Sequence, residues 1–277
     1  MEFPTHWVRE QYAGAGPDGR LITRSAYGWS NGDDAAAREM ALARAKRAVE
    51  YALRGRSATD EYGYGVDPAR EELIDTLYHE TTPIAAITRN RYGALVLNTR
   101  QVMFADIDRP VVKPSLFQRI FGRATPQLEA MSDRLRAWQA ERPAHALRLY
   151  QTAAGYRVIF VEAQHGPLDD QRDVLLRSLE TDRVYINLCR RQGCYRARLT
   201  PKPWRCGLHV PSARFPFHDA RHERVQRQWE QQYAERSKQY ATCRLLATIG
   251  GDATDPVVQR IVQFHDRFSL NDDRPLA

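Results

Sequence analysis

The chain has 277 residues, of which 43% are hydrophobic and 27% are charged, and this balance excludes a largely disordered protein. The formal net charge of +7 favours a polyanionic partner, with nucleic acid or nucleotides as the first candidates. The sequence holds no apolar run long enough to span a bilayer, and it begins without the basic head and apolar stretch typical of secretion signals, so we expect a cytoplasmic protein.

The N-terminal part is predicted to contain an extended segment and two helices. Residues 1–28 are polar and extended, with a Gly-Pro-Asp-Gly turn at 16–19. An acid at 33 or 34 can cap a helix that runs to about residue 53. Alanines at helical spacing indicate that this helix packs closely against a flat surface: Ala41, Ala45, Ala48 and Ala52. A second helix is expected to begin near residue 67 and to carry Leu73, Ile74 and Leu77.

The middle of the chain changes to a strand pattern. Short β-type runs at 84–88, 94–98 and 102–107 predict a hairpin or meander that ends in an acidic strand. A proline-containing connection and a helix with one apolar face follow; this face is formed by Leu128, Met131, Leu135 and Trp138. Two strands around a small-residue turn are predicted at 147–161. After them come a helix at 169–179, a short mixed segment and a strand at 195–199.

The last seventy or so residues are predicted to be helical. One helix carries Val225, Trp229 and Tyr233, and another begins at Thr254-Asp255-Pro256. The expected fold class is α+β, with a mixed or antiparallel sheet core and helices at both ends. We expect an N-terminal segment at 1–83, a core with the motifs at 84–210 and a C-terminal helical segment at 211–277.

The acidic strand is the most informative stretch of the sequence. An apolar run leads directly into Asp106 and Asp108, and side chains two apart on a strand point to the same face. Two carboxylates so close repel each other unless a cation neutralises them, and Mg²⁺ or Mn²⁺ prefers such oxygen ligands. The pair therefore predicts a Mg²⁺ or Mn²⁺ site. The alternative is a strand end whose acids lie in solvent.

The order of motifs resembles the archaeo-eukaryotic primase superfamily, which includes primases and primase-polymerases. Its first motif, an acidic pair on a strand, is similar to Asp106-Ile107-Asp108. Its second, a small-residue turn that leads into a strand, is similar to Thr152-Ala153-Ala154-Gly155-Tyr156-Arg157. The resemblance implies a primase-polymerase-like core in which Thr152 and Gly155 bind nucleotide and Arg157 stands at the position of a phosphate-holding histidine. Arginine can hold phosphate through two hydrogen bonds.

Later segments complete the resemblance with one departure. The third motif is an acid on a strand, and Val184-Tyr185-Ile186-Asn187 is similar to it, with Asn187 as a weak metal ligand in place of the acid. Glu162 and Asp182 are the other candidates for a third acid. The basic segment 194–204 resembles a strand that follows the third motif. There Arg196, Arg198 and Lys202 are expected to contact phosphates.

A second metal is predicted from four potential ligands, Cys189, Cys194, Cys206 and His209. Thiolates and imidazole in a tetrahedral set form structural Zn²⁺ sites. The alternative is that these are ordinary buried or exposed residues. Two further features have equally ordinary alternatives: the histidines His218 and His222 at helical spacing, and the basic, apolar connection at 109–123 that could contact a nucleic-acid strand.

Three functions follow from these residues. The first is metal-dependent nucleotidyl transfer on nucleic acid, in which a 3′-hydroxyl attacks an α-phosphate. The second is an inactive protein of the same fold that binds nucleic acid or nucleotide, since Arg157 replaces the histidine of the second motif and Asn187 replaces the acid of the third. The third is a metal-dependent nuclease that uses the same acids.

Overall fold

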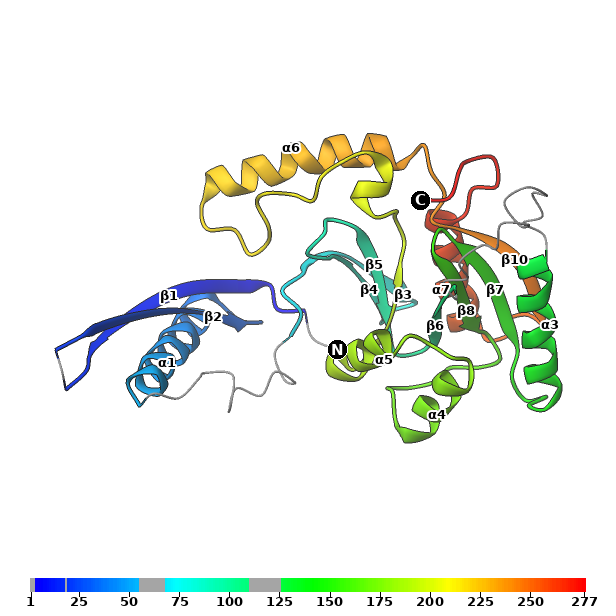
Figure 1. Cartoon of the computed structure of the whole chain (residues 1–277), viewed down its shortest axis with the longest axis horizontal. Coiled ribbons are helices and arrows are strands. Elements are labelled where there is room, and N and C mark those ends of the chain that lie inside the picture. The colour runs from blue at the N-terminus through cyan, green and yellow to red at the C-terminus, as the bar shows by residue number, and fades with distance from the viewer. Residues whose placement is uncertain (1–2, 18, 55–67, 110–125) are drawn as a thin grey trace, which may run out of the picture. The chain divides into compact units, whose positions relative to one another are not determined.

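The computed structural model describes residues 3–17, 19–54, 68–109 and 126–277. The α+β class is confirmed: these residues form six α-helices and antiparallel sheets of two, four and four strands (Figure 1). No helix within the described ranges is long and apolar enough to cross a membrane. Two compact units emerge, one of residues 74–210 and 230–277, the other of residues up to Leu73 together with 211–229. The sequence-based boundaries stood at 83 and 210.

The smaller unit is built on a hairpin covered by one helix. Strands β1 (His6–Ala15) and β2 (Leu21–Ser30) pair antiparallel around the predicted turn. Helix α1 (Asp34–Leu53) begins as expected, because the Asp33 side chain accepts the Ala36 N–H at 2.8 Å. A stripe of small side chains faces the hairpin, and Gly28 opposes it. A Cβ on Gly28 would lie 2.0 Å from the Ala37 carbonyl oxygen, so only glycine allows this close packing.

The larger unit contains both four-stranded sheets. The first sheet has the order β3 (Glu72–His79), β4 (Thr82–Arg89), β5 (Leu95–Thr99), β9 (Tyr195–Arg198). The second has the order β10 (Cys243–Ile249), β7 (Leu147–Thr152), β8 (Gly155–Phe160), β6 (Phe104–Asp108). The predicted hairpin of β4 and β5 is confirmed. The predicted meander is wrong, because the acidic strand β6 does not pair with β5. The apolar residues Val102 and Met103 are fully buried, and beyond them β6 pairs with β8 of the second sheet.

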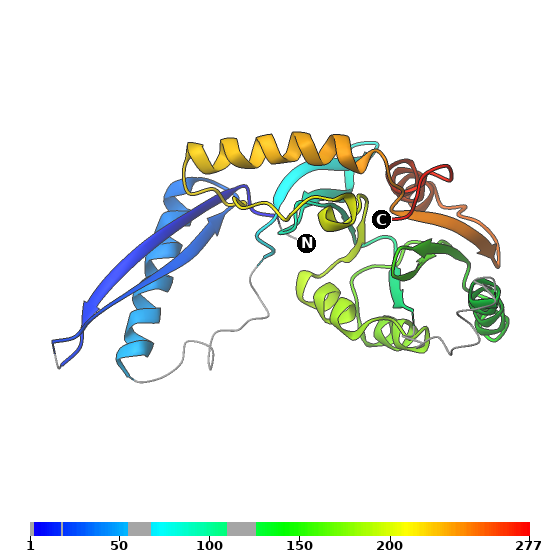
Figure 2. The ribbon, with the colours of Figure 1, turned by 45° about the horizontal axis from the view of Figure 1, so that its top comes forward.

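Helices complete this unit: α3 (Pro126–Ala140), α4 (Asp170–Ser178), α5 (Arg183–Gln192), α6 (Ala220–Ser237, which begins in the smaller unit) and α7 (Pro256–Ser269). The predicted apolar face of α3 is confirmed, with Met131, Leu135 and Trp138 buried. Helix α3 contacts β10, and in both views the helix lies next to that strand (Figures 1 and 2). The predicted start of α7 is also confirmed, since Asp255 caps it.

Three secondary-structure predictions are wrong. The helix expected from residue 67 is strand β3 where the structure describes it, since Leu73 and Ile74 are exposed and the chain pairs with β4. The segment 184–187, which the family resemblance read as a strand, lies in helix α5, with an Asp182 cap at one end and left-handed Gly193 at the other. The helical C-terminal part includes β10, which gains its ladder from β7.

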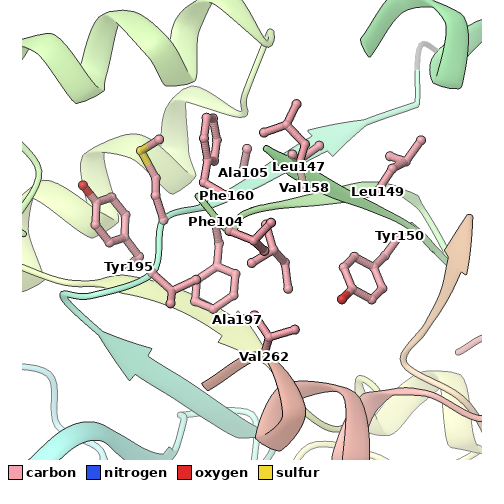
Figure 3. Close-up of a cluster of buried hydrophobic side chains, with 14 of the residues drawn as sticks. Phe104, Ala105, Leu147, Leu149, Tyr150, Val158, Phe160, Tyr195, Ala197 and Val262 are labelled. Atoms are coloured by element: carbon pink, nitrogen blue, oxygen red, sulfur yellow. The ribbon is translucent and has the colours of Figure 1, made fainter. Parts of the chain in front are cut away.

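The core of the larger unit takes side chains from both four-stranded sheets and from helices α3, α4, α5 and α7. Figure 3 shows Phe104 of β6, Val158 of β8 and Tyr150 of β7 gathered with Tyr195 of β9 and Val262 of α7. All five side chains are nearly or fully buried. This packing fixes β6 over its apolar half, so the acidic end of the strand is held in a defined position.

Candidate functional site

A pocket of about 330 Å³ opens at the acidic end of β6 and lies wholly within the larger unit. Its charged lining consists of three carboxylates and three cations: Asp106, Asp108, Asp182, Arg198, Lys202 and Arg205. The small-residue turn and an apolar side complete it: Thr152, Ala154, Gly155, Ile107, Tyr156, Val184, Tyr185 and Leu188. The pocket therefore combines hard oxygen ligands for a metal with donors for phosphate.

The acidic pair lies on strand β6, as the sequence predicted. Asp106 and Asp108 both line the pocket, and the buried Ile107 between them also contributes to the lining. Asp182, named from the sequence only as a fallback, joins them through α5. Its backbone N–H donates to the Asp106 carbonyl oxygen at 2.9 Å, and its side chain accepts the Val184 N–H at 2.9 Å. The N-terminus of α5 is thus tied to the acidic strand.

The other candidates for a third acid lie elsewhere. Asn187 is exposed on helix α5, not on the expected strand, and does not line the pocket. Glu162 Oε1 is 2.7 Å from His145 Nδ1, at the end of the β7–β8 hairpin opposite the small-residue turn. Asp182 is therefore the acid that the fold brings to the same pocket, although the three carboxylates of the described residues do not form a group arranged to hold a metal ion.

The small-residue turn is tied to the acidic strand by close packing. The Thr152 hydroxyl oxygen accepts the Gly155 N–H at 3.1 Å, and Gly155 lies opposite Asp108 in the ladder. A Cβ on Gly155 would lie 2.1 Å from the Ile107 carbonyl oxygen. Glycine at this position therefore lets the turn and β6 form one wall of the pocket.

Replacing Gly155 with alanine is expected to push β6 away from β8 and lower the free energy of unfolding by about 1–3 kcal/mol. Urea denaturation would measure the change. Gly32→Ala is the matched control, since its Cβ would meet nothing closer than the Ser30 Oγ at 3.5 Å. Equal stability of the two variants would contradict the close approach.

Arg157 does not occupy a phosphate-facing position. It lies opposite Asp106 in the ladder, is 1% exposed, and does not line the pocket. Its Nε is 3.5 Å from Asp106 Oδ1, and its Nη1 donates to the Arg198 carbonyl oxygen at 2.9 Å. The guanidinium is therefore a buried ion-pair partner of Asp106, and the Arg198 carbonyl oxygen and His265 Nε2 hold its Nη1 inside the core.

A polar network behind the pocket holds Arg157. Its Nη1 is 3.1 Å from His265 Nε2, and His265 Nδ1 is 2.9 Å from Asp266 Oδ1. Both contacts are satisfied by a neutral imidazole that donates from Nδ1 and accepts at Nε2. Burial, together with the nearby arginines Arg157 and Arg148, lowers the pKa of His265 despite the Asp266 carboxylate. A lowered pKa favours the neutral imidazole, which is the form that both hydrogen bonds require.

The lowered pKa of His265 predicts a loss of stability in mild acid. Below about pH 6.5 the unfolded imidazole binds a proton that the folded one does not, so the free energy of unfolding should fall as pH drops. The slope from this one group approaches about 1.4 kcal/mol per pH unit. Denaturation between pH 5 and 8 checks it against His265→Gln, which offers Arg157 an oxygen and does not titrate. Identical slopes in both proteins would argue against the neutral, buried histidine.

The basic side of the pocket includes two predicted residues and one that the sequence did not suggest. Arg198 and Lys202 line the pocket, and burial lowers the pKa of both side chains. Arg196 is buried on β9 opposite Asn98 and is not part of the lining. Arg205 enters from a short 3-10 turn, Pro203–Cys206. The sequence did hold a signal for Arg205, because this arginine follows Lys202 by three residues at a Pro-Trp turn.

The predicted zinc ligands do not come together. No group of three or more histidine, cysteine, aspartate or glutamate side chains in the described part of the chain is arranged to hold a metal ion. Burial raises the pKa of the Cys189 thiol to about 12 and that of Cys206 to about 11, which disfavours the thiolate that zinc requires. Zinc stays a prediction, and nothing in the geometry adds to it.

Two lesser candidates have ordinary surroundings or fall outside the described residues. His222 pairs with Asp219 at 3.2 Å, and the His218 ring lies against the Tyr27 ring. The basic connection at 109–123 lies outside the described ranges except for Arg109, whose N–H donates to the Ala154 carbonyl oxygen at 3.2 Å.

Comparison with known proteins adds no assignment. No family model matches the chain, and searches of curated proteins and of solved structures gave no significant match. The resemblance to primase-polymerases therefore rests on this chain's own residues.

Proposed function

We propose that the pocket binds a nucleoside triphosphate together with Mg²⁺ or Mn²⁺, and that the protein is a primase-polymerase-like nucleotidyltransferase acting on nucleic acid. The observation that supports this most is the meeting of three carboxylates with three cations in one pocket. Carboxylate side chains alone would suit a metal ion, and cationic side chains alone would suit a phosphate group. The two sets together match a complex of a metal ion with a triphosphate. We further propose that the protein acts in the cytoplasm.

The donor set fits a hard divalent cation. Asp106 and Asp108 offer carboxylate oxygens from one strand end, and Asp106 retains 39% exposure of its side chain. When bound, the metal would activate the attacking oxygen and stabilise the leaving pyrophosphate. The chain's own residues orient the substrate. Arg198, Lys202 and Arg205 hold phosphate oxygens, and the Thr152–Gly155 turn limits how close the triphosphate comes to β6.

Two other functions use the same residues. Binding without catalysis is favoured by Arg157, which places a permanent positive charge beside Asp106. A nuclease would use the metal and the acids on a phosphodiester. All three share the pocket and differ in what happens to a nucleic-acid strand.

One assay separates them. A labelled primer on a template is incubated with nucleoside triphosphates and Mn²⁺, using the wild type, Asp108→Asn and Asp133→Asn. Asp108 is the more exposed acid of the pair, so its replacement should leave the fold intact; Asp133, exposed on α3, is the control. Extension by the wild type and the control, and none by Asp108→Asn, is the expected result. Shortening of the primer would indicate the nuclease, and an unchanged primer with retained binding would indicate the inactive protein.

An exposed aromatic pair beside the basic side supports contact with a nucleic-acid strand. Trp204 is 48% exposed, and its ring centroid is 5.4 Å from that of Tyr92 in an edge-to-face arrangement. The Lys202 ammonium lies 5.4 Å from the Trp204 ring, and Arg205 follows in the pocket lining. Aromatic faces flanked by cations are typical of sites where unpaired bases stack.

Trp204→Ala is therefore expected to weaken binding of a single-stranded oligonucleotide by one to two orders of magnitude, from the loss of about 1–3 kcal/mol of stacking. Fluorescence anisotropy of a labelled oligonucleotide at fixed salt would measure the dissociation constant. Tyr78→Ala, which removes an equally exposed aromatic from β3, is the control. A loss of the same size in both variants would speak against stacking on Trp204.

A further inference from the structure

We propose that the pocket takes one divalent cation, because Arg157 acts as a fixed cation where a second ion would bind Asp106. This inference rests on the proposed function, since it concerns the same metal site. Beyond the proposed function, it specifies how many metal ions the pocket binds and what Arg157 does there. Sites with two ions hold them about 3.5–4 Å apart, bridged by shared oxygens. Whether such a bridge can form depends on the oxygens of the acidic pair.

Asp106 has one carboxylate oxygen that faces an internal cation. Its Oδ1 forms an ion pair with Arg157 Nε at 3.5 Å, without a hydrogen bond between them. A metal ion bonded to that oxygen at about 2.1 Å would bring two positive centres close together in a partly buried site, where their repulsion is poorly screened. Asp106 is therefore left with its other oxygen for a metal and does not bridge two ions.

Arg157 cannot turn aside to make room. Its Nη1 is held by the Arg198 carbonyl oxygen on β9 and by His265 Nε2 on α7, while its own backbone is in β8. The side chain is the largest of the fully buried ones in the described residues. The positive charge therefore remains at Asp106 whether or not a ligand is present.

The remaining carboxylates do not replace the missing bridge. The Asp182 side chain caps α5 by accepting the Val184 N–H, so one of its oxygens is also committed. Asp108 lies at the outer end of β6 and is exposed. The pocket thus offers Asp108 and one oxygen of Asp106 to a single ion, whose other ligands are water and phosphate oxygens.

Electron paramagnetic resonance of Mn²⁺ tests the inference with the wild-type chain. Protein and a non-hydrolysable nucleoside triphosphate are titrated with Mn²⁺, and bound ions are counted by equilibrium dialysis. We expect one bound Mn²⁺ per chain and a spectrum without spin coupling. Two bound ions with the spectrum of a coupled pair would overturn the inference and leave the proposed function standing. No bound Mn²⁺ would overturn both.

Arg157→Gln removes the positive charge and keeps a hydrogen-bonding side chain. If this variant is folded, as judged by circular dichroism, we expect a second Mn²⁺ and a coupled spectrum. A folded variant that still binds one ion would overturn the role of Arg157. If it does not fold, the wild-type count decides alone. His265→Gln retains Arg157 and should still bind one ion.

Discussion

Phe104→Ala is expected to lower the free energy of unfolding by about 3–5 kcal/mol, the usual cost of emptying a fully packed aromatic site. Phe104 is 1% exposed, lies opposite Ile159 in the ladder and packs near the His265 ring, at 6.1 Å between centroids. It also begins the strand that ends in the acidic pair. Its loss should therefore loosen β6 and lower stability, and it should also weaken the metal binding that we propose for the acidic pair.

Urea denaturation followed by tryptophan fluorescence would measure the effect of Phe104→Ala. Phe268→Ala is the matched control, because this phenylalanine on α7 is 43% exposed and its removal leaves no enclosed cavity. We expect the control to lose less than about 1 kcal/mol. A comparable loss in both variants would show that β6 is not held by its apolar half.

Asp266→Ala is the second substitution with a large expected effect, again about 3–5 kcal/mol, because it breaks a buried ion pair by removing one partner. The Asp266 carboxylate is mostly buried and accepts from Arg148 Nη2 at 3.0 Å, the Tyr150 hydroxyl at 2.9 Å and His265 Nδ1. Without it, Arg148 keeps its charge in a largely buried place. His265 also loses the contact that fixes which nitrogen faces Arg157.

Asp252→Ala is the control for Asp266→Ala. Asp252 pairs with the same arginine at 3.4 Å but is mostly exposed, so its removal should change the free energy of unfolding by about 0.5 kcal/mol or less. Thermal denaturation of both variants at neutral pH gives the comparison. Similar midpoints would show that the network behind the pocket contributes little to stability.

Local sequence patterns predicted the elements that local physics determines. The cap at Asp33, the apolar face of α3 and the proline start of α7 each depend on residues within a few positions, and all three are confirmed. The acidic pair was found for the same reason, because an apolar run that ends in alternating acids specifies both the strand and the face. The cap at Asp182 and the Gly193 stop of α5 were equally local signals that the family resemblance overrode.

The features that the sequence did not predict depend on contacts between residues far apart in the chain. Strand β10 is defined by its ladder with β7, and β6 leaves the first sheet because β8 provides a partner on the other. Arg157 looks like a surface cation from its neighbours in sequence. It is buried because His265, 108 residues away, accepts its hydrogen bond. Arg205 lies in the 3-10 turn that follows β9, and β9 itself is placed by its long-range pairing with β5.

Titration calorimetry of Mn²⁺ onto the wild type and Asp108→Asn, with and without a non-hydrolysable nucleoside triphosphate, tests the central claim most directly. A metal–triphosphate pocket predicts heat of binding in the wild type that strengthens with triphosphate and is lost in Asp108→Asn, while Asp133→Asn behaves as the wild type. Absence of Mn²⁺ binding in the wild type, or equal binding in Asp108→Asn, would contradict it and leave the acidic pair as a charged strand end.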